Sequence, residues 1–106
     1  MASSFSGSVW LLVDENNFSA ADGFAHFAKY SEFATVVGRR TGGIGVGLQS
    51  YVMILPNTGA AIYYEAHIAF NSDGTTNGII GTMPNIEIQQ GQNALEVVLE
   101  MIQGNN

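Results

Sequence analysis

The chain has 106 residues, of which 46% are hydrophobic and 11% are charged, and its formal net charge is −6. This length and composition allow one domain with a small core. The basic residues, Lys29, Arg39 and Arg40, are too few to form the clustered positive surface that nucleic acids and anionic membranes require. Because the chain has no cysteine, disulfides and thiolate zinc sites are excluded.

The first apolar run, residues 9–13, follows eight residues without a basic side chain. This run is too short for a membrane span or for the apolar region of a signal peptide. We therefore predict no transmembrane segment and no signal peptide, and the localisation stays open. We expect residues 1–7 to form a flexible N-terminal tail and residues 8–104 to form the folded part.

The first third of the chain predicts a strand, a helix and a second strand. Residues 9–13, VWLLV, form an apolar run that is typical of a strand buried on both faces. Apolar residues then recur at helical spacing, which predicts a helix over residues 19–30 with Phe24 and Phe27 facing the core. Residues 33–38, FATVVG, predict the second strand. This order indicates a βαβ unit in a parallel sheet.

The rest of the chain predicts a hairpin, a short strand and a closing helix. Residues 48–55 and 60–70 have the composition of strands, and the PNTG between them is a suitable turn. Residues 71–78, NSDGTTNG, predict a polar loop, and residues 86–88 a short last strand. Residues 93–103 predict a helix that is capped by its first residue, an asparagine. The predicted architecture is an α/β layer with a mixed sheet.

Ser19, the first residue of the predicted helix, has two interpretations. Ser19 and Asp22 have the spacing of a capping box, in which side chains satisfy the free N–H groups of the first helical turn. A serine at a strand-to-helix turn also lies beside the positive end of the helix dipole, where a developing oxyanion is stabilised. The two roles are compatible, and the local sequence does not separate them.

The motifs around Ser19 resemble those of a peptidase family. LLVDENNFSAADGFAHFAKY, FATVVGRRTGG and, after the predicted hairpin, GTMPNI follow one another within residues 8–88. Their order and spacing resemble the C-terminal part of the catalytic domain of the C-terminal processing (tail-specific) proteases and the related tricorn-type serine peptidases. The resemblance implies a crotonase-like (ClpP-like) ββα spiral, present here as a partial domain. It also implies a peptide or protein substrate and no cofactor.

The resemblance implies roles for particular residues. Ser19 matches the nucleophile that forms the acyl-enzyme, and the backbone N–H of Ala20 matches one oxyanion donor. In the Ser-Lys branch the base is a lysine, and Ile44, which cannot accept a proton, stands in its place. The tricorn-like branch uses a histidine N-terminal to the serine and an orienting glutamate, whose place is taken by Asn77 or Gly78. No histidine precedes Ser19, so we expect no base within this chain and no useful activity of the chain alone.

Two histidines follow Ser19 in the sequence. His26 is seven residues further along the same predicted helix, about 10 Å away by helix rise, which is beyond hydrogen-bond reach. Glu65 and His67 share one face of a predicted strand. Two such residues are a weak metal signal without a third ligand, so we predict no metal site and a half-buried packing role for His67.

Two classes of function remain open at this stage. The first is a serine peptidase segment that is completed by residues from a longer N-terminal part, which would carry a histidine and an oxyanion glycine. The second is a non-catalytic binding or assembly module that retains the peptidase fold. In either case a partial domain leaves an apolar edge or face uncovered, so we expect self-association or pairing with an N-terminal part. Bacterial members of the family are often exported, although nothing in this chain directs export.

Overall fold

The computed structural model describes residues 5–45 and 50–104, and it confirms the α/β class. Of the tail predicted over residues 1–7, residues 1–4 lie outside the described part. The elements in chain order are β1 (Trp10–Val13), α1 (Ala20–Tyr30), β2 (Thr35–Gly38), β3 (Tyr51–Ile54), β4 (Ala61–Tyr64), α2 (Asn77–Ile80), β5 (Ile86–Glu87) and α3 (Ala94–Gly104).

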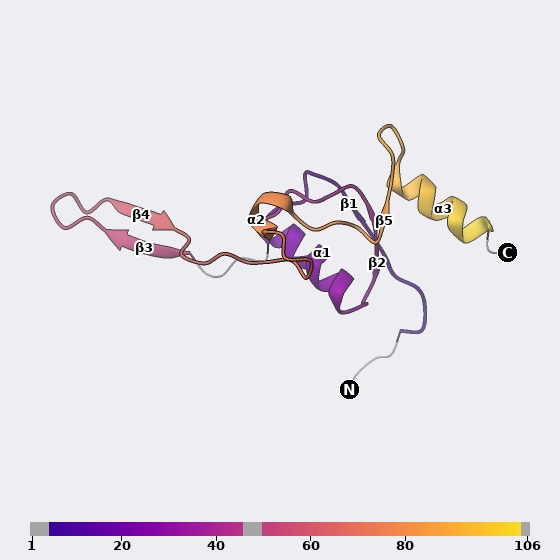
Figure 1. The fold of residues 1–106 in the computed structure, drawn as a ribbon, viewed down its shortest axis with the longest axis horizontal. Helices are drawn as coiled ribbons and strands as arrows, with labels where there is room; N and C mark the ends of the chain where they lie inside the picture. The colour runs from indigo at the N-terminus through magenta and orange to yellow at the C-terminus, as the bar shows by residue number, and fades with distance from the viewer. Residues whose placement is uncertain (1–4, 46–49, 105–106) are drawn as a thin grey trace.

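Three parallel strands in the order β1-β2-β5 form the central sheet. Successive residues of β2 point to opposite faces, as strand geometry requires. Val36 packs with Ala25 and Ala28 of α1, whereas Val37 packs with Ile88 and with Val98 of α3. The two longer helices therefore cover opposite faces of the sheet (Figure 1), and the predicted βαβ unit is confirmed.

Helix α1 is confirmed, but the prediction that Phe24 and Phe27 face the core is wrong. Their side chains are 48% and 55% exposed, and Ala25 and Ala28 are buried instead. The small alanines let the helix lie close to the sheet, because a short three-stranded sheet offers little surface for larger side chains. Phe24 and Phe27 pack with Phe33 at ring-centroid distances of 6.3 and 6.1 Å, and the three form an outward-facing aromatic cluster.

The prediction of one mixed sheet is also wrong. Strands β3 and β4 form a separate antiparallel pair with Tyr51 opposite Tyr64, and this hairpin extends away from the central sheet (Figure 1). As a result β1 has only β2 as a neighbour among the described strands. Val13 is the buried residue of β1 and Leu12 is 38% exposed, so β1 is not buried on both faces as predicted.

The C-terminal third contains one helix that the sequence predicts and one that it does not. Helix α3 is confirmed, and Asn93 Oδ1 accepts hydrogen bonds from the N–H groups of Leu95 at 2.9 Å and Glu96 at 3.3 Å. The four-residue helix α2 begins inside the predicted polar loop 71–78, so that loop is shorter than expected. Among the described residues, no helix is both long and apolar enough to cross a membrane.

Candidate active site

A tight polar turn connects the end of β1 to Ser19. The Asp14 N–H donates to Asn17 Oδ1 at 2.7 Å, and the Asn17 N–H donates back to the Asp14 carbonyl at 3.0 Å. Asp14 Oδ1 also accepts from the Asn16 N–H at 2.8 Å. Asx-type contacts of this kind fix a reversal of the chain without regular secondary structure. The turn therefore places Ser19 at the junction between the strand and helix α1.

Ser19 has a strained backbone. Its φ of 57° and ψ of −126° lie in a region that favours glycine, and the side chain makes no capping hydrogen bond. The predicted capping box is therefore wrong, because a capping serine needs an extended backbone to reach the N–H groups of the first turn. Strain of this kind is concentrated at functional sites, and a sharp strand-to-helix turn is how α/β-hydrolases expose a nucleophilic serine.

A glycine-rich segment, residues 41–45, holds the backbone around Ser19. The Ser19 N–H donates to the Gly43 carbonyl at 2.9 Å, and the Gly42 N–H donates to the Asn17 carbonyl at 2.8 Å. Gly43 has a φ of 86°, and a Cβ atom placed on it would lie 2.6 Å from the Asn77 carbonyl oxygen. Only glycine fits where the backbone at residue 43 passes the backbone of Asn77. This close passage and the two hydrogen bonds hold Ser19 between the turn and the glycine-rich segment.

The Ser19 hydroxyl and the Ala20 backbone N–H belong to residues on the surface. Ser19 and Ala20 are both exposed at the start of α1. Within the described ranges, no residue hydrogen-bonds to the Ser19 hydroxyl or accepts from the Ala20 N–H. The first N–H groups of a helix lack internal partners and carry partial positive charge. Among the described residues, the Ser19 hydroxyl and the Ala20 N–H, neither of which has a hydrogen-bond partner, therefore belong to adjacent residues.

The structure brings together the other positions that the motifs indicated. Ile44, Asn77 and Gly78 line one small cavity of about 90 Å³, together with Glu65 and His67. A Cβ atom placed on Gly78 would lie 3.8 Å from Ile44 Cγ2. Ile44 follows Gly43, the acceptor for the Ser19 N–H, so this cavity lies next to the glycine-rich segment that holds Ser19.

Asn77 is part of a buried polar network that sequence reasoning missed. Its side chain is fully buried, and its Nδ2 group donates to Asn71 Oδ1 at 3.3 Å and to Thr82 Oγ1 at 3.4 Å. The Thr82 N–H donates to Thr41 Oγ1 at 2.7 Å, and Thr41 Oγ1 donates to Asp22. The network joins α1, the glycine-rich segment and α2. Two of its contacts, from Thr41 to Asp22 and to Thr82, join residues that are far apart in the sequence, so no local pattern indicates it.

Among the described residues, neither histidine forms a hydrogen bond with Ser19. The His26 ring packs on Tyr30 at 4.4 Å between centroids, and burial is the main cause that lowers the pKa of His26. Its buried Nε2 has no partner among the described residues. His67 is exposed and not half-buried as predicted, and its ring lies 5.5 Å from that of Tyr51. The described residues contain no group of three or more His, Cys, Asp or Glu that could hold a metal.

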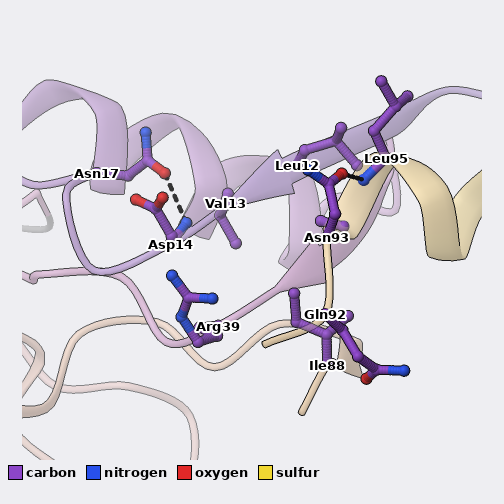
Figure 2. Close-up of a pocket in the computed structure, with 10 residues that line it drawn as sticks. Leu12, Val13, Asp14, Asn17, Arg39, Ile88, Gln92, Asn93 and Leu95 are labelled. Atoms are coloured by element: carbon purple, nitrogen blue, oxygen red, sulfur yellow. Dashed lines mark hydrogen bonds between the residues drawn. The ribbon is translucent and has the colours of Figure 1, made fainter. Parts of the chain in front are cut away.

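A hollow of about 390 Å³ lies at the carboxyl edge of the parallel sheet (Figure 2). Ligands of open α/β sheets bind at this edge. Asp14, Asn17 and Arg39 form its polar side, and residues at the start of α3 close it. Arg39 Nε donates to Glu15 Oε2 at 2.8 Å, and this guanidinium lowers the pKa of the Glu15 carboxyl. The hollow thus adjoins the turn that carries Ser19.

Comparison with known proteins identifies the family of the chain. The sequence model of peptidase family S41 matches residues 2–88. The chain belongs to peptidase family S41. This S41 chain has no significant match among curated proteins.

Solved structures also match this S41 chain. Mature CPAF complexed with lactacystin is 30% identical with a TM-score of 0.60, and the match covers 76% of this chain and 15% of that one. The photosystem II D1 C-terminal processing protease is 25% identical with a TM-score of 0.56, and the match covers 80% of this chain and 22% of that one. These neighbours confirm the family predicted from the motifs, and the chain spans less than a quarter of their length.

We predict that Ser19→Gly stabilises the chain. Glycine relieves a backbone strain of about 1–3 kcal/mol, and the greater freedom of glycine in the unfolded state removes about 0.5–1 kcal/mol of that gain. The expected net gain in free energy of unfolding is about 1 kcal/mol, measured by urea denaturation. Ser19→Ala is the control, because alanine keeps the strain and should give no gain. A glycine variant no more stable than the alanine variant would show that Ser19 is not strained.

Proposed function

We propose that this S41 chain bears the nucleophile of a serine peptidase and that Ser19 forms the acyl-enzyme. The observation that carries the proposal is the strained, exposed Ser19 beside the Ala20 N–H, which has no partner within residues 5–45 and 50–104. The family and the protease neighbours support a peptidase-type function. We also propose that the sheet, helices and hairpin are the C-terminal part of a crotonase-like spiral.

In the proposed reaction, Ser19 Oγ attacks the carbonyl carbon of the scissile peptide bond while its proton passes to a base. The oxyanion that forms accepts a hydrogen bond from the Ala20 N–H. The C–N bond then breaks, the leaving amine takes up the proton, and an ester forms on Ser19 Oγ. Water hydrolyses this ester with help from the same base, which releases the acid product and restores the hydroxyl.

The base in this proposal comes from outside the described residues. Ile44 has no proton acceptor, and His26 lies about two helical turns from Ser19, which is too far for direct transfer. Asn77, one of the two residues (with Gly78) that match the position of the orienting glutamate, is already engaged with Asn71 and Thr82. We therefore propose that an N-terminal part of a longer protein supplies a histidine, and that the 106-residue chain alone is inactive. Labelling of Ser19 by a fluorophosphonate, with and without such a part, tests the proposal.

A second candidate is a non-catalytic module that retains the fold. Asn77 favours it, because Asn77 or Gly78 stands where the family has an acid, and the buried hydrogen bonds of Asn77 suit a structural role. The two candidates differ in one measurable property. A nucleophile requires the Ser19 hydroxyl to react in the completed protein, whereas a binding module does not need this hydroxyl at all.

The hairpin gives a reason to propose self-association. Every residue from 50 to 68 is exposed, including Tyr63 at 74% and Ile54 at 57%. Residues 41–64 contain no charged side chain, whereas the chain as a whole carries −6. An isolated two-stranded hairpin is marginally stable, and its open edges can pair with another strand. Two copies that meet at their hairpins would keep their negative charges apart.

We predict that the chain sediments as a dimer or larger species at tens of micromolar, on the order of ordinary weak-dimer concentrations. Tyr63→Lys places a charge on the hairpin and should shift the chain toward monomer. Ile79→Lys is the matched control, because Ile79 is 81% exposed on α2, away from the hairpin, and this change should leave association unaltered. A clean monomer at this concentration, or equal effects of both substitutions, would contradict hairpin-mediated association.

A further inference from the structure

We propose that Asp22 is a positioning residue that sets the backbone of Ser19 through the glycine-rich segment 41–45. The proposal rests on the proposed role of Ser19 and adds a residue to it. Asp22 lies in the first turn of α1, and its side chain is fully buried. Aspartate is almost never fully buried unless its oxygens are paired, so its partners define its purpose.

The partners of Asp22 lie on the glycine-rich segment and not on its own helix. Asp22 Oδ1 accepts a hydrogen bond from Thr41 Oγ1, and Oδ2 accepts from the Gly45 N–H at 2.8 Å. The carboxylate therefore holds both ends of a five-residue segment. A carboxylate is suited to this because both of its oxygens accept hydrogen bonds, whereas an amide would present an NH₂ group to one of the two donors.

The middle of that segment contacts Ser19. The Gly43 carbonyl accepts from the Ser19 N–H at 2.9 Å, and the Ser19 carbonyl in turn accepts from the Gly23 N–H at 2.9 Å. A closed circuit of contacts thus runs from Asp22 to the segment, from the segment to Ser19, and back along the first helical turn. Fixing the two ends of the segment fixes the acceptor that holds Ser19 in its strained backbone.

The segment is anchored on its other side as well. Thr41 Oγ1 accepts from the Thr82 N–H at 2.7 Å while it donates to Asp22. A Cβ atom placed on Gly45 would lie 2.0 Å from the Gly23 nitrogen, so the segment lies directly on the first turn of α1. Loss of the carboxylate contacts should therefore disturb the Gly43 carbonyl in the middle of the segment. Hydrogen exchange at the Ser19 amide, which donates to that carbonyl, should report the disturbance.

Asp22→Asn tests the proposal in the 106-residue chain by amide hydrogen exchange followed by NMR. We expect exchange at the Gly45 and Ser19 amides to become about ten- to a hundred-fold faster, the range given by loss of one charge-assisted hydrogen bond. The Val37 amide in the sheet should change little. Asp73→Asn is the matched control, because Asp73 also accepts from one N–H and one hydroxyl, both of Thr75, but on an exposed loop.

Acceleration at Gly45 without acceleration at Ser19 would overturn the proposal, because Asp22 would then be structural only. No acceleration at either amide would overturn it too. If Asp22→Asn prevents folding, Thr41→Val removes one of the same contacts and should accelerate exchange at Ser19, and Thr41→Ser should restore the slow rate. Failure of that restoration contradicts the coupling. Fluorophosphonate labelling reports separately on the proposed function, so an unreactive Ser19 with the expected exchange pattern refutes only the nucleophile.

Discussion

Gly38→Ala is expected to remove a large part of the stability of the chain. Gly38 ends β2 opposite Val13, and a Cβ atom placed on it would lie 1.8 Å from the Val13 carbonyl oxygen. The obstacle is backbone in the paired strand, so no side chain can turn away to make room. Overpacking of this severity, added to a φ of 144°, should lower the free energy of unfolding by at least about 3 kcal/mol. A small domain has only about 5–15 kcal/mol in total.

Gly91→Ala is the matched control for that experiment. Gly91 also has a positive φ, 89°, but a Cβ atom placed there meets nothing within 4 Å. The expected loss in free energy of unfolding for Gly91→Ala is then only the cost of a positive φ in a residue that has a Cβ atom, which is about 1–2 kcal/mol. Urea denaturation followed by circular dichroism measures both variants. Equal losses would show that φ alone matters, and a stable Gly38→Ala variant would contradict the close β1–β2 pairing.

The sequence predicts the elements that depend on local periodicity. The runs that become β1 and β2 and the helix between them follow from apolar spacing and strand propensity, which act over a few residues. The direction in which α1 faces does not follow from spacing, because Phe24 and Phe27 share the apolar stripe with Ala25 and Ala28. Which of these side chains face the core depends on the space between the helix and the three-stranded sheet. That space exists only in the folded chain, so local spacing does not reveal it.

The candidate site also combines features that the local sequence predicts with features that depend on the folded chain. The motif order predicts where Ser19 lies, but its strain and its hydrogen bond to Gly43 are long-range features. The spacing of Ser19 and Asp22 predicted a local cap. The structure pairs Asp22 with Thr41 and Gly45 instead, 19 and 23 residues away. Local capping patterns cannot reveal such partners, because they come together only when the chain folds.

Fluorophosphonate labelling of Ser19 is expected to depend on a part of the protein that carries a histidine. Such a probe reports nucleophilic attack by the hydroxyl, and general-base assistance contributes about 10²–10⁴-fold to this kind of step. The 106-residue chain should therefore label slower by about that factor than a longer protein in which the same segment follows a histidine-bearing N-terminal part. Mass spectrometry of the adduct identifies the labelled residue and gives its rate.

Ser19→Ala in the longer protein is the control, because it removes the hydroxyl and leaves the strained backbone in place. It should abolish labelling, whereas Ser31→Ala should not, since Ser31 Oγ already donates to the Phe27 carbonyl at 2.6 Å at the far end of α1. Rapid labelling of Ser19 in the chain alone would mean that a base exists among its own residues, with His67 as the next residue to replace. A longer protein that labels elsewhere, or that is indifferent to Ser19→Ala, would leave the strained serine without a catalytic role and favour the binding module.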